Sequence, residues 1–303
     1  MDYLEYVNEK YPIRRSKSEK EDFRKYVLSK VESSKYDAYV ETDKKSNNVI
    51  IGNINEAEVI FTAHYDTPAA SIIPNILLPK NKVLRRLAWL LSIIVSVIIC
   101  CKLDNLITKE FYEKRMLIEI LILVLFVLLC YLLFFCFRNK HNKNDNTSGV
   151  ATILSLVSEC SAKNIAFVLF DNEERGKLGS KAFKKKHNGI IKDKLVINFD
   201  CVGVGNHVLF IAKESAMNHV LYDNLKKYIK INNSFDVEFC SSKDACSNSD
   251  YKNFECSISV MICEEKNDIL YVDKIHTNKD VEAYSENINF LVDNMLKFIR
   301  EGI

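Results

Sequence analysis

Two adjacent carboxylates, Glu173 and Glu174, are the residues of this sequence that most directly suggest chemistry, because they closely follow the apolar run 167–170. Such a run predicts a buried strand, and open α/β sheets carry their functional sites at the carboxyl ends of their strands. Candidate partners stand at the ends of similar runs or in short polar motifs: His64, Asp66, Asp145, Asp200 and His276.

Imidazole and carboxylate groups together indicate a site for borderline or hard cations such as zinc. Two cations a few Å apart need a carboxylate that can bridge them. Five ligands and one spare carboxylate are the set that a two-metal hydrolase requires, and the spare carboxylate can act as the base. Each motif is weak alone, since an adjacent Glu-Glu pair is most often a solvated helix face.

Five motifs occur in the order that is typical of the M28 family of zinc aminopeptidases. They are Ala-His-Tyr-Asp-Thr at 63–67, Asn-Asp-Asn-Thr-Ser-Gly at 144–149, Asp-Asn-Glu-Glu-Arg-Gly at 171–176, Phe-Asp-Cys-Val-Gly at 199–203 and Ile-His-Thr-Asn-Lys-Asp at 275–280. The chain resembles this family from about Val59 to Ala283, apart from one large insertion.

The resemblance implies two zinc ions held by five residues. His64 and Asp200 would hold one ion, Glu174 and His276 would hold the other, and Asp145 would bridge them. Because a carboxylate-rich shell also tolerates other metals, manganese and cobalt are alternatives to zinc.

The resemblance also implies the catalytic residues. Glu173 would be the general base, and Asp66 would accept the other N–H of the His64 imidazole and so fix its tautomer. The segment 249–254 is similar to a Ser-Asp-His-x-x-Phe loop of the family, with Tyr251 in place of the His. Tyr251 is a weak candidate for polarising the scissile carbonyl.

Strand and helix patterns alternate along the chain, which is typical of βαβ units. Strands are expected at 36–41, 48–51, 58–63, 165–170, 195–200, 208–211, 236–240 and 258–263. Helices are expected at 2–11, 18–32, 147–160, 179–187, 216–231 and 282–300, the second opening with a Ser18–Glu21 capping box. We predict an α/β fold with a mixed, mostly parallel sheet sandwiched by helices, as in zinc exopeptidases.

The insertion has a different composition from the rest of the chain. Residues 87–101 carry no charge, and residues 116–137 carry only Glu119. These runs predict a transmembrane hairpin, with spans at about 84–103 and 116–137; the alternative is a pair of buried helices in a soluble lid. The hairpin, 77–138, would divide the peptidase domain into residues 1–76 and 139–303.

An even number of spans is required because His64 and Asp145, which flank the insertion, are expected to share a metal. Positive residues flank the two spans on one side: Lys80, Lys82, Arg85, Arg86, Arg138, Lys140 and Lys143. The positive-inside rule places the peptidase domain on the cytoplasmic face of the cell membrane. The charged first twenty residues indicate that no signal peptide is present, and the scattered cysteines favour reduced thiols.

The balance of 42 Lys and Arg against 40 Asp and Glu gives no sign of a nucleic-acid surface. The sequence therefore predicts a membrane-anchored di-zinc aminopeptidase that acts on peptides, hydrophobic or membrane-associated ones in particular. Two alternatives are an inactive membrane receptor or scaffold with this fold, and a glutaminyl cyclase, which shares the fold but binds one zinc. Every ligand position is filled, which argues against the receptor.

Overall fold

Three strands buried at every position form the centre of the computed structural model: β3 (Val59–His64), β4 (Ile165–Phe170) and β5 (Leu195–Phe199). Continuous apolar runs of this length suit parallel strands that are covered by helices on both faces. The structure describes residues 2–71, 75–81, 115–131, 137–229 and 234–303, together with single positions and short runs between 83 and 102.

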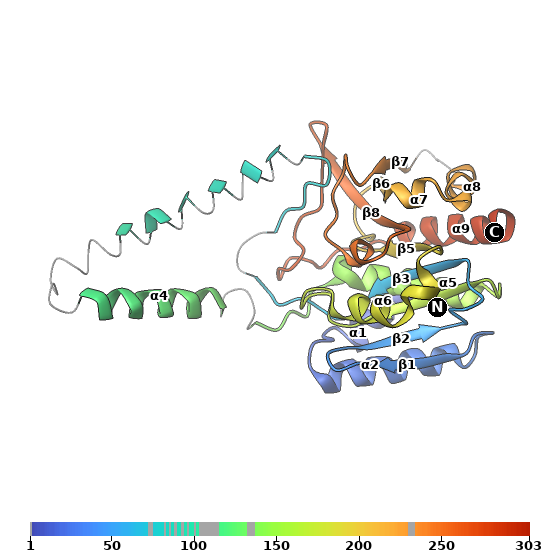
Figure 1. Cartoon of the computed structure of the whole chain (residues 1–303), viewed down its shortest axis with the longest axis horizontal. Helices are drawn as coiled ribbons and strands as arrows, with labels where there is room; N and C mark the ends of the chain where they lie inside the picture. The colour runs from blue at the N-terminus through green and yellow to red at the C-terminus, as the bar shows by residue number, and fades with distance from the viewer. Residues whose placement is uncertain are drawn as a thin grey trace.

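Within these residues the sheet has nine strands, in the order β1-β2-β4-β3-β5-β8-β6-β7, with β9 paired to β8 (Figure 1). The remaining strands are β1 (Ala38–Thr42), β2 (Asn47–Ile51), β6 (His207–Ala212), β7 (Asp236–Ser241), β8 (Ser257–Lys266) and β9 (Ile269–Tyr271). Strand β9 was not predicted, because its three residues are too few to show an alternating pattern.

The sheet is mixed, as predicted, but it is mostly parallel only at its centre. Strands β4, β3, β5 and β8 run parallel, and β6 pairs parallel with β7. Strands β1 and β2, β2 and β4, β6 and β8, and β8 and β9 are antiparallel pairs. Short turns join β1 to β2 and β8 to β9, and strands joined in this way must be antiparallel.

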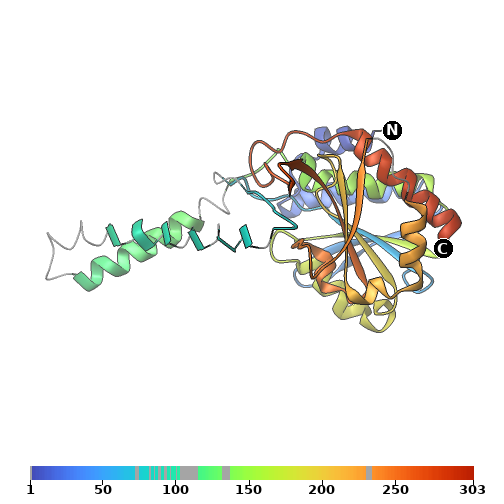
Figure 2. The ribbon, with the colours of Figure 1, turned by 90° about the horizontal axis from the view of Figure 1, so that it is seen from above.

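Helices cover both faces of this sheet, which Figure 2 shows between the two layers. One apolar cluster joins the strands to helices α1, α2, α5, α7, α8 and α9, and a second joins the opposite face to α6. The bounds are α1 (Tyr3–Lys10), α2 (Lys17–Val31), α5 (Ser148–Glu159), α6 (Leu178–Ile191), α7 (Glu214–Met217), α8 (Val220–Tyr228) and α9 (Ser285–Gly302). The predicted helices are therefore present, with two local corrections.

The capping box of α2 is formed by Ser16 and Glu19, so the prediction of Ser18 and Glu21 was wrong. The Glu19 carboxylate accepts a hydrogen bond from the Ser16 backbone N–H at 2.8 Å, and the Ser16 hydroxyl accepts one from the Glu19 N–H at 3.3 Å. Both residue pairs satisfy the Ser-x-x-Glu spacing. The extended backbone of Ser16 decides between them, because a capping residue lies outside the helix.

The predicted helix 216–231 is two helices, α7 and α8, that meet at His219. The His219 backbone is extended, and its imidazole Nδ1 accepts a hydrogen bond from the Leu221 N–H at 3.2 Å. This side chain caps α8 and so ends the continuous helix, which the apolar spacing alone does not indicate.

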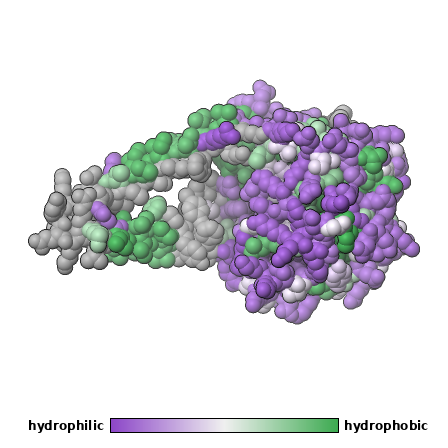
Figure 3. Space-filling model, in the orientation of Figure 1, coloured by the Kyte–Doolittle hydropathy of each residue, from purple (hydrophilic) through white to green (hydrophobic). Residues whose placement is uncertain are grey.

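The insertion, 77–138, forms an arm that projects from the domain, and most of the described residues seen on it in Figure 3 are apolar. Its described helix, α4 (Arg115–Tyr131), covers most of the second predicted span, and Leu121 and Leu123 on it are 57% and 61% exposed. No helix among the described residues is both long enough and apolar enough to cross a membrane. Much of the first predicted span and residues 132–136 of the second lie outside the described residues.

The two ends of the arm meet at the domain. Ala69 and Arg138 form an antiparallel bridge, in which the Ala70 N–H donates to the Phe137 carbonyl at 3.0 Å. Leu77 pairs with Val272 through two backbone hydrogen bonds of 2.8 and 3.0 Å. The chain therefore returns to the place where it leaves, as a hairpin insertion requires.

Candidate metal centre

Three parallel strands carry four of the predicted site residues to one edge of the sheet. His64 is the last residue of β3, Glu173 and Glu174 follow β4, and Asp200 comes directly after β5. Because β3 pairs with both β4 and β5 in parallel, their carboxyl ends lie side by side. The local cause is the one expected from the sequence, namely apolar runs that end in polar residues.

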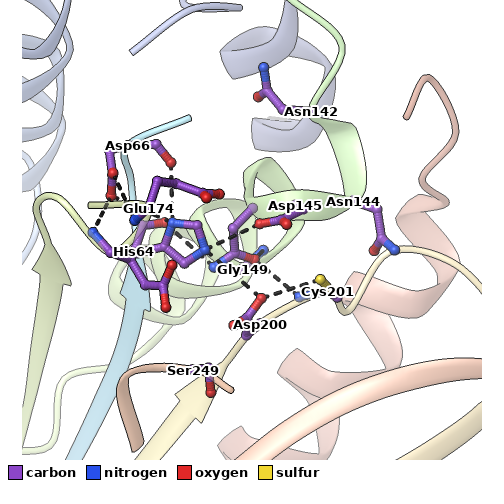
Figure 4. A network of polar contacts seen from close by, with 12 residues as sticks. His64, Asp66, Asn142, Asn144, Asp145, Gly149, Glu174, Asp200, Cys201 and Ser249 are labelled. Atoms are coloured by element: carbon purple, nitrogen blue, oxygen red, sulfur yellow. Dashed lines mark hydrogen bonds and ion pairs between the residues drawn. The ribbon is translucent and has the colours of Figure 1, made fainter. Parts of the chain in front are cut away.

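The remaining two predicted ligands reach this edge from loops. Asp145 lies in η3 (Lys143–Thr147), immediately before α5, at a point where the backbone is not helical, and Figure 4 shows its carboxylate beside His64 and Asp200. His276 follows β9, has a left-handed backbone with φ of 57° and accepts a hydrogen bond on its carbonyl from the Ser71 N–H. The structure thus brings all the predicted site residues together.

The two histidines contact opposite oxygens of one carboxylate. His64 Nε2 lies 3.3 Å from Asp145 Oδ1 and 3.9 Å from Asp200 Oδ1. His276 Nε2 lies 2.9 Å from Asp145 Oδ2 and 3.4 Å from Glu174 Oε1. Ligand atoms bound to zinc at about 2.0–2.1 Å in a tetrahedron lie about 3.3 Å from one another. The spacing therefore fits two adjacent zinc ions with Asp145 between them.

The chemistry of the donors also fits zinc. Among the described residues, the sets of three donors that lie within 4.8 Å of one another are His64–Asp145–Asp200, Asp145–Glu174–His276 and His64–Glu173–Glu174. Asp145 joins the set of His64 and Asp200 to the set of Glu174 and His276, as a bridging ligand would, and His64 and Glu174 also belong to two sets each. Nitrogen and carboxylate oxygen donors suit zinc, and also manganese and cobalt.

The electrostatics of the cluster favour positive charge. Burial by itself would lower the pKa of His64, but hydrogen bonds to the Asp145, Asp200 and Asp66 carboxylates raise it well above its ordinary value. Burial would likewise lower the pKa of His276, and Glu174 and Asp145 raise it well above that of a free imidazole. Bound cations would balance the charge of these buried carboxylates.

Asp66 lies beside His64, but its backbone carbonyl is closer to the imidazole than the carboxylate is, and it has a second role that the sequence did not indicate. His64 Nδ1 lies 3.1 Å from the Asp66 carbonyl oxygen and 3.6 Å from its carboxylate. Because both neighbours of Nδ1 are oxygens, Nδ1 would keep its proton when Nε2 gives its lone pair to a metal ion. The Asp66 carboxylate also accepts hydrogen bonds from the backbone N–H groups of Glu173, at 2.9 Å, and Glu174, at 3.2 Å.

Glu173 lies beside the cluster, with a carboxylate oxygen within 4.8 Å of donor atoms of His64 and Glu174. Its pKa is raised well above the ordinary value, first by burial and then by the charges of the Asp250, Glu174 and Asp200 carboxylates, which outweigh the opposing effect of His64. A carboxylate whose pKa is raised toward neutrality accepts and returns a proton more readily than an ordinary surface carboxylate does.

Asp280 fixes the loop that carries Asp145. Its carboxylate oxygens accept hydrogen bonds from the backbone N–H groups of Asn144, at 2.8 Å, and Asp145, at 3.0 Å. Burial raises the pKa of Asp280 to about 7. Asp280 ends the last sequence motif, four residues after His276, but the motif does not indicate that its carboxylate contacts Asn144 and Asp145.

Arg14 is a fully buried cation beneath the same loops, and the sequence analysis did not identify it. Its guanidinium donates hydrogen bonds to the carbonyls of Tyr65, at 2.5 Å, and Tyr11, at 2.7 Å, and to the side chains of Thr147, at 3.0 Å, and Asn142, at 3.3 Å. Burial lowers the pKa of Arg14 to about 10. It ties the N-terminal segment to the segments that follow His64 and Asp145.

The cluster opens into a cavity of about 300 Å³, lined by His64, Asn75, Leu77, Asp145, Glu173, Glu174, Gly176, Lys177, Asp200, Cys201, Ser247, Asn248, Met261, Ile275 and His276. Tyr251 does not line this cavity: it is 2% exposed and packs in a third apolar cluster with Met261 and Ile275. Its position therefore gives no support to contact with a scissile carbonyl.

Comparisons with known proteins agree with this geometry. The family model for peptidase family M28 matches residues 141–296, slightly more than half of the chain. The match includes Asp145, Glu173, Glu174, Asp200 and His276. No curated protein matched the chain.

Solved structures of three bacterial proteins share the fold at low sequence identity. A Zn-dependent exopeptidase from Parabacteroides distasonis has a TM-score of 0.59 and 14% identity, and the alignment covers 99% of this chain and 97% of that one. The Legionella LapA protein has a TM-score of 0.59 and 15% identity, with coverage of 99% and 71%. A Fimbriiglobus ruber glutaminyl cyclase has a TM-score of 0.54 and 13% identity, with coverage of 98% and 92%.

Proposed function

Because the chain belongs to peptidase family M28, we propose that it is a di-zinc aminopeptidase, which removes N-terminal residues from peptides. The observation that carries this proposal is the position of the Asp145 carboxylate, whose two oxygens face His64 and His276 on opposite sides. His64 and Asp200 would hold one zinc ion, and His276 and Glu174 would hold the other.

Zinc bound at these residues supplies Lewis acidity, which lowers the pKa of a water molecule and polarises a substrate carbonyl. The chain supplies the positioning and the proton transfer. The Asp66 backbone carbonyl keeps the proton of His64 on Nδ1, and the Asp66 carboxylate holds the backbone N–H groups of Glu173 and Glu174. The base and two of the ligands are therefore oriented by one buried residue, through its backbone carbonyl and its carboxylate.

Glu173 moves the proton during hydrolysis. Its carboxylate takes a proton from the attacking water as the new C–O bond forms at the scissile carbonyl carbon. The same carboxyl then gives that proton to the leaving nitrogen as the C–N bond breaks, so that one water is consumed and one acid and one amine are released. The raised pKa of Glu173 suits a group that must both accept and return a proton.

The cavity supports action at a chain end. Its volume of about 300 Å³ is at the lower limit for ligand pockets, so it suits a terminal residue better than the middle of a long chain.

The test follows peptides with free and acetylated N-termini by mass spectrometry, with the zinc-loaded protein and its Glu173→Gln variant. Stepwise loss of N-terminal residues from the free peptides alone, and none with the variant, is the expected result. Cleavage of acetylated peptides would contradict the aminopeptidase assignment, and no cleavage of any peptide would contradict peptidase activity.

A glutaminyl cyclase is the second candidate, because the Fimbriiglobus ruber cyclase shares the fold. The presence of a ligand set on each side of Asp145 favours two ions and hence the peptidase. Metal analysis separates the two: about two zinc ions per chain supports the peptidase, and one zinc together with cyclisation of an N-terminal Gln supports the cyclase. An inactive receptor would bind peptides without changing them.

We also propose that the arm, 77–138, anchors the peptidase domain, 1–76 and 139–303, at the cytoplasmic face of the cell membrane. The apolar side chains exposed along α4 support this, since soluble proteins rarely expose apolar patches of such length. Leu77, at the root of the arm, lines the cavity, so apolar peptides held near the bilayer are the proposed substrates.

Flotation with phosphatidylcholine vesicles tests the anchor. The full-length chain is expected to float with the vesicles, and a Leu121→Glu/Val124→Glu variant is expected to float less. If the full-length chain stays in the vesicle-free fraction, as the variant does, membrane association is contradicted.

A further inference from the structure

Lys177 stands at the boundary between the site and α6. Its backbone N–H donates to the Glu173 carbonyl at 2.7 Å, and its left-handed backbone, with φ of 59°, turns the chain into the helix. Its side chain is only 16% exposed and lines the metal cavity. The ammonium group is therefore held at the site, although neither the motifs nor the proposed hydrolysis gives it a role.

Lys177 brings a positive charge into the metal cavity. Among the described residues that line the cavity, it is the one Lys or Arg. Its Nζ lies 3.3 Å from Asn248 Oδ1 and 3.4 Å from the Asn248 carbonyl, which are long hydrogen bonds to neutral groups. The nearest carboxylate oxygen, Oε1 of Glu173, is 3.8 Å away. A substrate carboxylate would offer this ammonium a shorter, charge-assisted contact.

The position of Glu173 determines which part of a substrate lies near Lys177. If Glu173 returns the proton to the leaving nitrogen, that nitrogen must lie within hydrogen-bond distance of its carboxylate. In a dipeptide the leaving residue carries its free carboxylate two bonds away from this nitrogen, so the carboxylate oxygens lie about 3 Å from it. An ammonium 3.8 Å from Glu173 Oε1 is within reach of that carboxylate.

We propose that Lys177 binds the free C-terminal carboxylate of the substrate, and that the preferred substrates are dipeptides. In a longer peptide the same position holds a neutral amide, which cannot form the ion pair. The apolar side chains of Leu77, Met261 and Ile275 also line the cavity and suit apolar residues. This proposal depends on the proposed function, because it takes Glu173 as the group that protonates the leaving nitrogen.

The test compares Leu-Ala, its C-terminal amide and Leu-Ala-Ala as substrates of the zinc-loaded protein. For the native chain, kcat/KM for Leu-Ala is expected to be about tenfold or more above the values for the amide and the tripeptide. This factor is the usual strength of a charge-assisted hydrogen bond. Lys177→Met is expected to lower kcat/KM for Leu-Ala by about the same factor, mainly by raising KM. It is expected to change kcat/KM for the amide by less than about twofold. Lys177→Arg should retain part of the preference.

Lys181→Met is the matched control, since Lys181 is an exposed lysine one turn further along α6 and does not line the cavity. It is expected to leave all three rates unchanged. Calorimetry provides a readout that needs no turnover: the Glu173→Gln protein should bind Leu-Ala about tenfold more tightly than the amide, and Glu173→Gln/Lys177→Met should bind both equally.

The outcomes separate this proposal from the proposed function. Equal cleavage of Leu-Ala and its amide by the native chain would overturn the role of Lys177 and leave the aminopeptidase intact. Equal losses on both substrates in Lys177→Met would also overturn it, because they would show an action on the carbonyl or on Glu173. Cleavage of none of the three peptides would instead refute the peptidase, and the carboxylate role with it.

Discussion

The acidic edge of the sheet and the apolar arm depart from the usual distribution of side chains in opposite directions. At the edge, charged groups are buried: His64 is 1% exposed and Asp145 is 4% exposed. On the arm, large apolar groups are exposed, with Leu123 at 61%. Folded proteins normally bury apolar side chains and leave charges in water, so each region is stable only with an added component. We propose cations for the edge and a bilayer for the arm.

The two regions also differ in how firmly the domain holds them. Each loop at the edge is fixed by buried hydrogen bonds from distant segments, such as those of Asp66 to Glu173 and of Asp280 to Asp145. The arm joins the domain through backbone pairs at its root, Ala69 with Arg138 and Leu77 with Val272. Changes at the edge should therefore alter catalysis and stability, whereas changes along the arm should alter mainly where the protein resides.

Asp145→Ala is expected to have the largest effect, because it removes a ligand from both metal positions at once. We expect kcat/KM to fall by more than about 10³-fold and the zinc content to fall below two ions per chain. Peptide hydrolysis and metal analysis on the same preparation measure both. Two bound zinc ions in this variant would show that Asp145 is not the bridge.

Arg14→Met is expected to destabilise the domain by about 3 kcal/mol, because it leaves several buried acceptors without a donor. Urea unfolding of chelator-treated protein measures this without the contribution of bound zinc. Arg300→Met, at an exposed position of α9, is the control and should change the free energy of unfolding by less than about 0.5 kcal/mol. Equal effects of the two substitutions would contradict the structural role of Arg14.

Arg14 also shows the limit of what the sequence reveals. The strands that carry His64, Glu173 and Asp200 were predictable, because each is a continuous apolar run that ends in a polar residue. The contact of Arg14 with Thr147 joins residues 133 positions apart, and nothing in the local pattern around Arg14 indicates it. Such long-range polar contacts follow from the folded topology and not from periodicity.

The same distinction separates the two roles of Asp66. Its position two residues after His64 made an imidazole contact predictable, because neighbouring residues of a chain end can meet locally. Its hydrogen bonds to the N–H groups of Glu173 and Glu174 depend on the parallel pairing of β3 with β4. Only the assembled sheet brings these segments together.

Asp66→Asn tests this second role. An asparagine side chain has one acceptor oxygen, so it cannot serve both backbone N–H groups as the carboxylate does, and its neutral amide loses the attraction to His64. We expect a loss of about 10- to 100-fold in kcat/KM or in zinc affinity, the usual effect of altering a group that orients a metal ligand. Chelator competition and steady-state kinetics measure the two; unchanged values in both would show that Asp66 is dispensable.

Replacement of residues 83–131 by a flexible Gly-Ser linker should have the smallest effect on catalysis. The replacement keeps Leu77 and Arg138, and with them both backbone pairs at the root of the arm. Because the edge is held by contacts within the domain, kcat/KM for a soluble dipeptide should change by less than about twofold. The variant should also remain soluble without detergent, since the exposed apolar surface is gone.

The same variant decides whether the arm serves catalysis or only location. If the arm presents membrane-bound substrates, the variant should hydrolyse apolar peptides bound to vesicles more slowly than the full-length chain, while both hydrolyse the soluble dipeptide equally. Equal rates on the vesicle-bound peptides would restrict the arm to anchorage. A large loss on the soluble dipeptide would show that the arm helps to hold the edge in its active geometry, so that the two regions are not independent. Leu77 would be the connection, because it lines the cavity and pairs with the strand-like segment before His276.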